Sequence, residues 1–213
     1  MVIVNTVVIV RSLLDLSDSD VAVALVCFGG GSMVAALSLP RVLDRAGDRR
    51  IMLLAAALLV LLLLVFAALF WTAPSTVWSA LLVTWALLGV GYSAILVPTG
   101  RLLRRSAHAG DRPALFAAQF SLSHACWLLT YPLAGWLGLS VGIPTTLVAL
   151  ATLTFIGLIA AHLLWPADDP EIIPHKHDEL PLDHPHLMDR PGNEHAHVFV
   201  IYDLHPHWPT ARS

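Results

Sequence analysis

Long stretches without a charged residue divide this chain into regular blocks. Five such stretches, each of 19 residues or more, cover residues 21–39, 51–71, 76–98, 113–138 and 143–165. A helix of about 20 residues rises about 1.5 Å per residue and therefore crosses the ~30 Å hydrocarbon core of a bilayer. The pattern predicts an all-α protein with five transmembrane helices.

The opening stretch, residues 1–10, is equally apolar, but it covers only about half of a bilayer before Arg11 ends it. A cleavable signal peptide would need a basic region before its apolar stretch and a small-residue cleavage site after it. Residues 1–10 have neither feature. We therefore expect them to form the last part of a sixth helix whose beginning is missing.

Composition supports a lipid bilayer as the main partner. Hydrophobic residues make up 57% of the chain and charged residues only 13%, whereas soluble domains carry about 25% charged residues. The net charge of −3 gives no basic surface for nucleic acid. No nucleophile with a base, metal-bound water site or nucleotide-binding loop occurs at usable spacing, so we expect no catalytic residues and no enzyme activity.

Arginines in the short loops predict the orientation. Residues 40–50 and 99–112 each hold four arginines, whereas residues 72–75 and 139–142 carry no charge. Because basic loops stay in the cytoplasm, both arginine-rich loops are predicted to be cytoplasmic. The chain is therefore expected to cross the cell (inner) membrane several times, with a cytoplasmic C-terminus.

Small residues in the spans predict close helix packing, because they let two backbones approach each other. One group is Gly29, Gly30, Gly31 and Ser32, and a second is Gly89 with Ser93 one helical turn later.

Polar side chains concentrate in the span of residues 113–138. Such residues are costly in hydrocarbon and often mark a transport pathway. We predict a substrate pathway with His124 as a metal ligand or proton relay; the alternative is a hydrogen-bonded histidine between helices. Gln119, Ser123, Cys126 and Thr130 share one helical face, and His124 lies beside it with Ser121 and Tyr131.

Residues 166–213 form a separate tail after the bundle of residues 1–165. Eight of the 11 histidines lie here as four H-x-H pairs: His175 and His177, His184 and His186, His195 and His197, His205 and His207. Imidazole is a good ligand for nickel, zinc and copper, and only its neutral form binds. We predict a tail that binds a divalent metal such as Ni²⁺, less strongly below about pH 6.5, and no obligatory cofactor.

Frequent prolines predict that the tail is irregular. Residues 197–204 are apolar enough to form a short strand or to dock on the cytoplasmic face of the bundle. The alternative for the whole tail is a solvated low-complexity segment with incidental metal affinity.

The loop PRVLDRAGDRR, residues 40–50, resembles the G-x-x-x-D-[RK]-x-G-[RK]-[RK] motif of the major facilitator superfamily, although Pro40 and Asp48 depart from it. Such departures are common in the second copy of this motif. The resemblance implies that Asp44, Arg45 and Arg49 form a conformational latch between two transporter halves. The alternative is a solvated turn that follows the positive-inside rule.

If this loop joins helices eight and nine, residues 1–10 end helix seven. The resemblance then implies the C-terminal half of a transporter, and a six-helix N-terminal half would be a partner if it is encoded separately. Asn5 and Thr6 would belong to a helix that lines the transport cavity in this family. Because transport needs one half to rock against the other, a lone half is not expected to transport.

The span QFSLSHACWLLTYPLAGWLG and the tail segments HDELPLDHPHL and HVFVIYDLHPHW resemble the nickel-resistance branch of this superfamily. The resemblance implies proton-coupled export of a divalent metal cation, nickel or cobalt. Since no span contains Asp or Glu, an exporter of small organic compounds with a regulatory metal-binding tail is an alternative. A membrane-anchored metal buffer is a third possibility.

Overall fold

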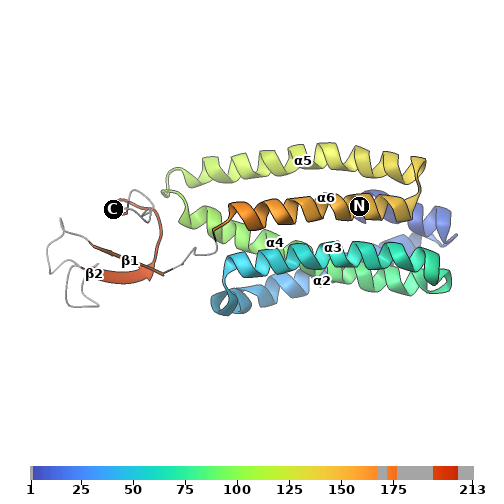
Figure 1. Ribbon diagram of the computed structural model, residues 1–213, viewed down its shortest axis with the longest axis horizontal. Coiled ribbons are helices and arrows are strands. Elements are labelled where there is room, and N and C mark those ends of the chain that lie inside the picture. The colour runs from blue at the N-terminus through green and yellow to red at the C-terminus, as the bar shows by residue number, and fades with distance from the viewer. Residues whose placement is uncertain (1, 167–171, 177–193, 206–213) are drawn as a thin grey trace.

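The computed structural model describes residues 2–166, 172–176 and 194–205 (Figure 1). A short helix α1 (Val2–Val7) continues as the π-helix η1 (Val8–Leu13). The long helices are α2 (Asp18–Ala46), α3 (Asp48–Thr72), α4 (Val77–Arg105), α5 (Arg112–Ser140) and α6 (Ile143–Leu164). A 3₁₀ turn, η2 (Pro74–Thr76), precedes α4, and two strands follow the bundle, β1 (Ile172–Lys176) and β2 (Glu194–Val198).

All five predicted spans are long helices, and four of them combine the length and apolarity needed to cross a membrane: α2, α3, α4 with η2, and α6. Helix α5 has 29 residues, but the polar side chains that mark it in the sequence make it less apolar. Residues 2–13 form a shorter apolar helix, in agreement with the predicted partial span. The described residues therefore form a multi-pass helical bundle.

The helices run further than the charge-free stretches indicate. Residues 40–50, predicted to be a loop, lie almost entirely in helix, because α2 continues past Pro40 to Ala46 and α3 begins at Asp48. Only Gly47 separates them, at a φ of 72° that a residue without Cβ adopts readily. Arginine side chains can reach water from a helix that continues past the hydrocarbon, so charge does not mark the helix end.

Local sequence signals set the helix starts. Ser17 accepts a hydrogen bond from the backbone of Asp20, whose carboxylate bonds back to Ser17, and this capping box begins α2. A proline stands in the first turn of α5 and of α6, where its missing N–H costs no hydrogen bond.

Helices α2 and α4 make the closest contact in the bundle. A Cβ on Gly31 would lie 1.9 Å from the Ala86 carbonyl oxygen, and one on Gly89 would lie 2.1 Å from that of Phe28. Beside them the hydroxyls of Ser32 and Ser93 are 2.7 Å apart. The two predicted small-residue groups thus meet each other, because glycine lets the backbones touch.

Helix α3 packs between α4 and α6 and completes the apolar core. Phe66 on α3 meets Trp85 on α4 edge to face, with ring centroids 5.4 Å apart. Leu147 on α6 and Ile9 of η1 are buried in the same cluster. Large apolar side chains hold these helices together through dispersion and shape, unlike the backbone contact of α2 with α4.

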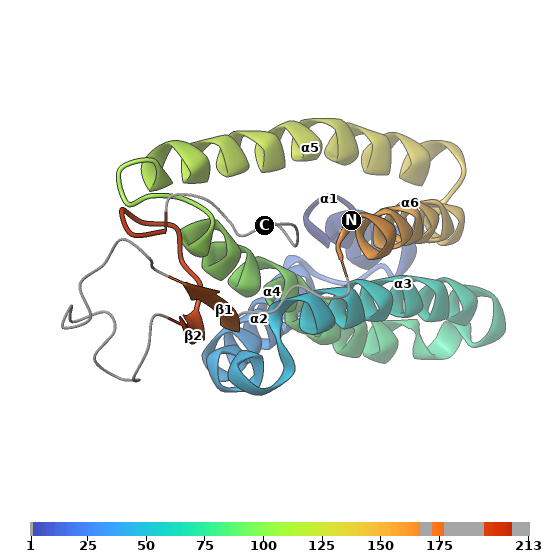
Figure 2. The ribbon, with the colours of Figure 1, turned by 60° about the vertical axis from the view of Figure 1, so that its left-hand side comes forward.

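Helix α5 lies along one side of the bundle, apart from α2 and α3 (Figure 1, Figure 2). Ala134 is its only buried residue. The polar side chains of α5 therefore remain accessible on a helix that the described residues cover at few points.

The described part of the tail contains a two-stranded antiparallel ribbon, at the left of Figure 1. Its register pairs Ile173 with His197 and His175 with His195. The sequence predicts an irregular tail, and the ribbon is a difference from that expectation. Proline blocks helix but is tolerated in an edge strand, and Pro174 stands within β1.

We predict that the substitution Gly89→Ala destabilises the bundle by about 1–3 kcal/mol, because the added methyl group forces α2 away from α4. Thermal unfolding in detergent measures the change. Gly30→Ala is the matched control, since a Cβ there meets nothing within 4 Å. Equal stability of the two variants would contradict the close contact.

Candidate functional site

Asn5 and Thr6, predicted pathway residues, are buried where α1 meets α4 and α5. The Asn5 side chain donates a hydrogen bond to the Ala134 carbonyl at 3.3 Å, and the Trp85 indole N–H donates to the Thr6 hydroxyl at 2.8 Å. Thr6 itself donates to the Val2 carbonyl. These hydrogen bonds hold the short helix α1 in the bundle, because unsatisfied polar groups are costly in hydrocarbon.

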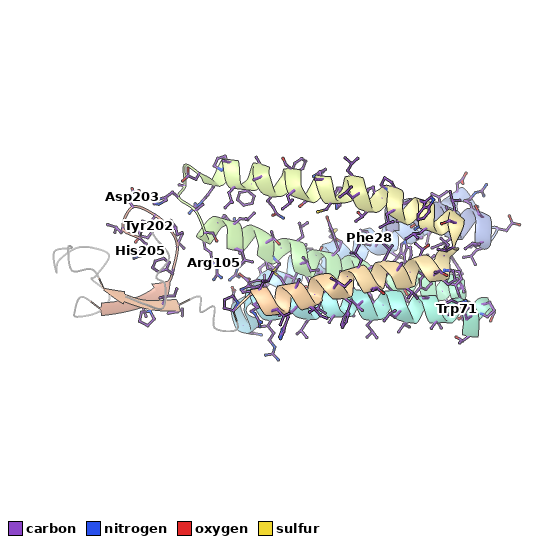
Figure 3. All side chains as sticks on the ribbon, turned by 45° about the horizontal axis from the view of Figure 1, so that its top comes forward. Phe28, Trp71, Arg105, Tyr202, Asp203 and His205 are labelled. Carbon is purple, nitrogen blue, oxygen red and sulfur yellow. The ribbon has the colours of Figure 1, made fainter. Side chains whose placement is uncertain are left out.

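A cavity of about 280 Å³ lies between α5 and the other helices. Apolar and aromatic side chains form most of its wall, and Phe28, Tyr92, Trp127 and Tyr131 supply its rings. Figure 3 shows Phe28 near the middle of the bundle. None of the described residues that line the cavity is charged, so its shape and polarity suit an apolar or aromatic guest.

His124 belongs to an aromatic series on α5 that leads toward this cavity. Its ring centroid is 3.8 Å from that of Phe120 and 4.6 Å from that of Trp127, which stacks on Tyr131. The His124 Nδ1 atom lies 2.8 Å from the Phe120 carbonyl oxygen. If Nδ1 donates there, Nε2 carries the lone pair and can accept a proton or bind a metal.

Two of the other predicted pathway residues on α5, Gln119 and Ser123, bond to each other within the helix. The Gln119 amide donates to the Ser123 hydroxyl at 3.3 Å, and Ser121 is exposed. The described residues contain no group of three or more His, Cys, Asp or Glu that could hold a metal ion. His124 therefore has aromatic neighbours in this structure rather than other metal ligands.

Eight arginines mark one end of the bundle, where α2, α4 and α6 end, and we call it the basic end. Here Arg101 of α4 reaches the carboxylates on both sides of Gly47. Its Nη1 lies 3.1 Å from the Asp44 carboxylate, and its Nε lies 3.4 Å from that of Asp48. Asp48 is only 4% exposed, whereas Asp44 is exposed.

Of Arg101, Asp44 and Asp48, only Asp44 was predicted from the sequence to be a site residue. Asp48 stands where the motif usually has a basic residue, and Arg101 lies in what the sequence presents as a loop. The departure of Asp48 from the motif is the one signal in the sequence, and its burial explains why it needs a cation nearby. The cation comes from another helix, and sequence spacing does not reveal it.

Arg49 contacts a different helix from Asp44, namely α6 rather than α4. Its guanidinium donates to the carbonyls of Trp165, at 3.2 Å, and His162, at 3.3 Å. These are terminal carbonyls of α6, where a cation satisfies free acceptors and interacts favourably with the helix dipole. Arg45 is exposed. Of the predicted latch residues, Asp44 thus contacts α4 and Arg49 contacts the end of α6.

The sequence model of the Major Facilitator Superfamily matches residues 1–200. The chain belongs to the major facilitator superfamily. No curated protein and no solved structure matches it. Membership confirms the family resemblance of residues 40–50 and identifies a multi-pass membrane protein from a family of transporters rather than enzymes.

The predicted metal ligands of this superfamily member are only partly described. His177, His184, His186 and His207 lie outside the described residues, and only the backbone is described for His175, His195 and His197. The ribbon register nevertheless pairs His175 with His195, which belong to different H-x-H pairs. His205 is described in full and is only 4% exposed.

We predict that Arg101→Gln destabilises the bundle by about 2 kcal/mol, because it removes a cation from the buried carboxylate of Asp48. Chemical unfolding in mixed micelles measures the loss. The double variant Arg101→Gln with Asp48→Asn should recover most of the stability. Asp44→Asn, at the exposed carboxylate, is the control and should cost less than about 1 kcal/mol. A larger cost for Asp44→Asn than for Arg101→Gln would contradict this assignment.

Proposed function

We propose that this protein exports a divalent transition-metal cation, nickel or cobalt, from the cytoplasm in exchange for protons. Its tail binds the metal on the cytoplasmic side, at the basic end. The bundle acts as one six-helix half and works with a second half, since members of this superfamily rock two halves around a central site.

The observation that carries this proposal is the ribbon register. Residues paired across an antiparallel ribbon have Cβ atoms about 4.5–5.5 Å apart, and residues two apart in a strand lie on the same side. The pairing of His175 with His195 therefore puts positions 175, 195 and 197 on one side. Histidines at these register positions support a metal site in the tail, because imidazole is a suitable ligand for a transition metal.

Within the bundle, the proposed pathway follows α5. His124, Gln119, Ser121 and Ser123 lie on a helix with little coverage, so a second half can reach them. The lone pair on the His124 Nε2 atom would bind the metal or carry the exchanged proton. Asp44 and Arg49 lie at the basic end, where latch residues would hold one conformation until transport begins.

A second candidate is the export of small organic compounds with the tail as a regulator. The cavity favours it, because its aromatic wall has no charged side chain among the described residues. A divalent cation normally meets carboxylates or imidazoles, whereas a planar organic molecule gains from contact with Tyr92, Trp127 and Tyr131.

Nickel uptake into everted vesicles tests the proposed transport. We predict uptake driven by a proton gradient when the chain is present with a six-helix N-terminal half, and none when it is alone. His124→Ala should lower the rate at least about tenfold if the imidazole contacts metal or proton, whereas Ser140→Ala, at the last residue of α5, should leave it unchanged.

Other results of these measurements would distinguish the three candidate functions. Absence of nickel uptake in both cases would overturn the metal-export proposal, and proton-driven uptake of an aromatic compound instead would support the second candidate. Removal of residues 166–213 should weaken nickel tolerance of cells only in part. Complete loss of tolerance, without any vesicle uptake, would identify a membrane-anchored buffer.

Metal binding by the full chain should depend on pH. Histidine with a pKa near 6.5 is mostly neutral at pH 7.5 and only about one-tenth neutral at pH 5.5, so a site with two imidazoles should lose about a hundredfold in affinity. Calorimetry with Ni²⁺ measures this. His175→Ala with His195→Ala should remove the tightest site, and His162→Ala is the control. Equal affinity at both pH values would argue against imidazole ligands.

A further inference from the structure

Residues 199–205, which we call the docking hairpin, attach the tail to the end of α4. The Ile201 backbone N–H donates a hydrogen bond of 3.1 Å to the carbonyl of Arg105, the last residue of α4. Tyr202 and His205 exchange backbone hydrogen bonds of 3.2 and 2.8 Å, which close the hairpin. Figure 3 shows Tyr202 and His205 beyond this end of α4, near Arg105.

Aromatic packing stabilises the docking hairpin. Phe199 is 3% exposed and His205 is 4% exposed, and their ring centroids are 4.7 Å apart. The Tyr202 ring meets His205 edge to face at the same distance, and partial burial raises the pKa of the Tyr202 phenol. The hairpin is therefore a packed unit, and it can carry a mechanical restraint between the points that it contacts.

A second contact joins the hairpin to the loop before α5. The His108 Nδ1 atom lies 3.9 Å from the Asp203 carboxylate, so a protonated His108 forms an ion pair with it. The His108 carbonyl in turn accepts hydrogen bonds from the backbone N–H groups of Asp111 and of Arg112, the first residue of α5. Figure 2 shows the hairpin, in red, beside this loop. The hairpin thus contacts the end of α4 directly and the start of α5 through His108.

Few contacts within the bundle fix the position of α5. Its one buried residue, Ala134, accepts the hydrogen bond from Asn5 and lies 22 residues after Arg112, which is about 33 Å along the helix. Residues 112–133, all of which the structure describes, have no buried side chain. Helix α5 is therefore held by α1 at its far end, and its basic end depends on the loop.

We infer that the docking hairpin is a clip that sets the angle of α5 against α4. When docked, it bridges Arg105 and His108 and keeps the basic end of α5 close to the bundle. When undocked, it lets α5 pivot near Ala134 and move outward at the basic end. The inference goes beyond the proposed function, because it requires neither metal binding nor transport.

Movement of α5 would change access to the interior. Trp127 and Tyr131 form the α5 side of the aromatic cavity, and His124 lies next to them. An outward pivot therefore widens the cavity and separates its α5 wall from the rings of Phe28 and Tyr92. The tail thus controls how far the cavity opens toward the basic end.

The contacts of the clip are weak enough for it to open. Loss of one backbone hydrogen bond shifts an equilibrium by about fivefold to tenfold. The Asp203 side chain is exposed and that of His108 is 37% exposed, so their pair adds no more than about fivefold. Contacts of this strength favour the docked position without locking it.

Cross-linking of the full chain in nanodiscs tests docking. Cys27→Ser and Cys126→Ser remove the two native cysteines, and the test pair is His108→Cys with Asp203→Cys. A short bifunctional methanethiosulfonate should join this pair at least about tenfold faster than the control pair, Arg50→Cys with Asp203→Cys. Arg50 is exposed at the same end of the bundle but belongs to α3. Equal rates for the two pairs would overturn docking.

Spin-label distances test the effect on α5. In the same background without native cysteines, labels at Leu54→Cys on α3 and Ala117→Cys on α5, both exposed, report the separation of these helices near the basic end. We expect one narrow distance distribution for the docked chain. Ile201→Pro removes the N–H donated to Arg105 and should raise a longer-distance population at least about fivefold. Ile201→Ala keeps this N–H and is the matched control, which should retain the narrow distribution.

A charge reversal tests the contact with the loop. His108→Glu places a second carboxylate beside Asp203, so repulsion should raise the longer-distance population about threefold. His108→Glu with Asp203→Lys restores attraction and should return the narrow distribution. A purely structural role of His108 within the loop would not give this recovery.

Several results would overturn the clip. An unchanged distance distribution in Ile201→Pro would show that the contact with Arg105 does not hold α5. The same broadening in Ile201→Ala would exclude the backbone N–H as the cause, and failure of the double variant to recover would exclude the contact with His108. These measurements use neither metal nor transport. Failure of the clip therefore leaves the proposed function standing, and failure of nickel uptake leaves the clip standing.

Discussion

The backbone contact between α2 and α4 is the constraint on which the rest of the bundle depends. Gly31 and Gly89 allow it, and any side chain at either position would separate the helices. Asp44 follows Gly31 by thirteen residues and Arg101 follows Gly89 by twelve, which puts both about 18–20 Å further along two parallel helices. The glycines therefore set the level at which the ion pair of the basic end forms.

At the basic end, arginine side chains connect different helices as well as contacting water. Arg101 connects α4 with Asp44 and with the buried Asp48, and Arg49 caps the terminal carbonyls of α6. The backbone carbonyl of Arg105 then accepts a hydrogen bond from the N–H of Ile201 in the tail. Helices α2, α3, α4 and α6 and the tail are thus linked within a few helical turns. A change in one of these contacts therefore alters the positions of the residues in the adjacent contacts.

The interior and the tail favour different ligands. The cavity has an aromatic, uncharged wall among the described residues, whereas the ribbon pairs His175 with His195. His124 shares a property with each of them. Its neighbours are aromatic rings, as in the cavity, and its imidazole can bind a proton or a metal, as the tail histidines can. In the tail, His205 packs against the Phe199 ring and is also a member of a histidine pair.

The sequence by itself determined the helices and the family, because a bilayer requires about 20 apolar residues per span and the motif of residues 40–50 is local. It also identified Gly31, Gly89 and Ser93 as contact residues, since only small side chains permit such packing. Only the tertiary structure decided which partner each residue meets. Asp48 with Arg101, Arg49 with α6, and His205 buried beside Phe199 join segments far apart in the chain. Spacing carries no information about such contacts, because the relative placement of helices and tail creates them.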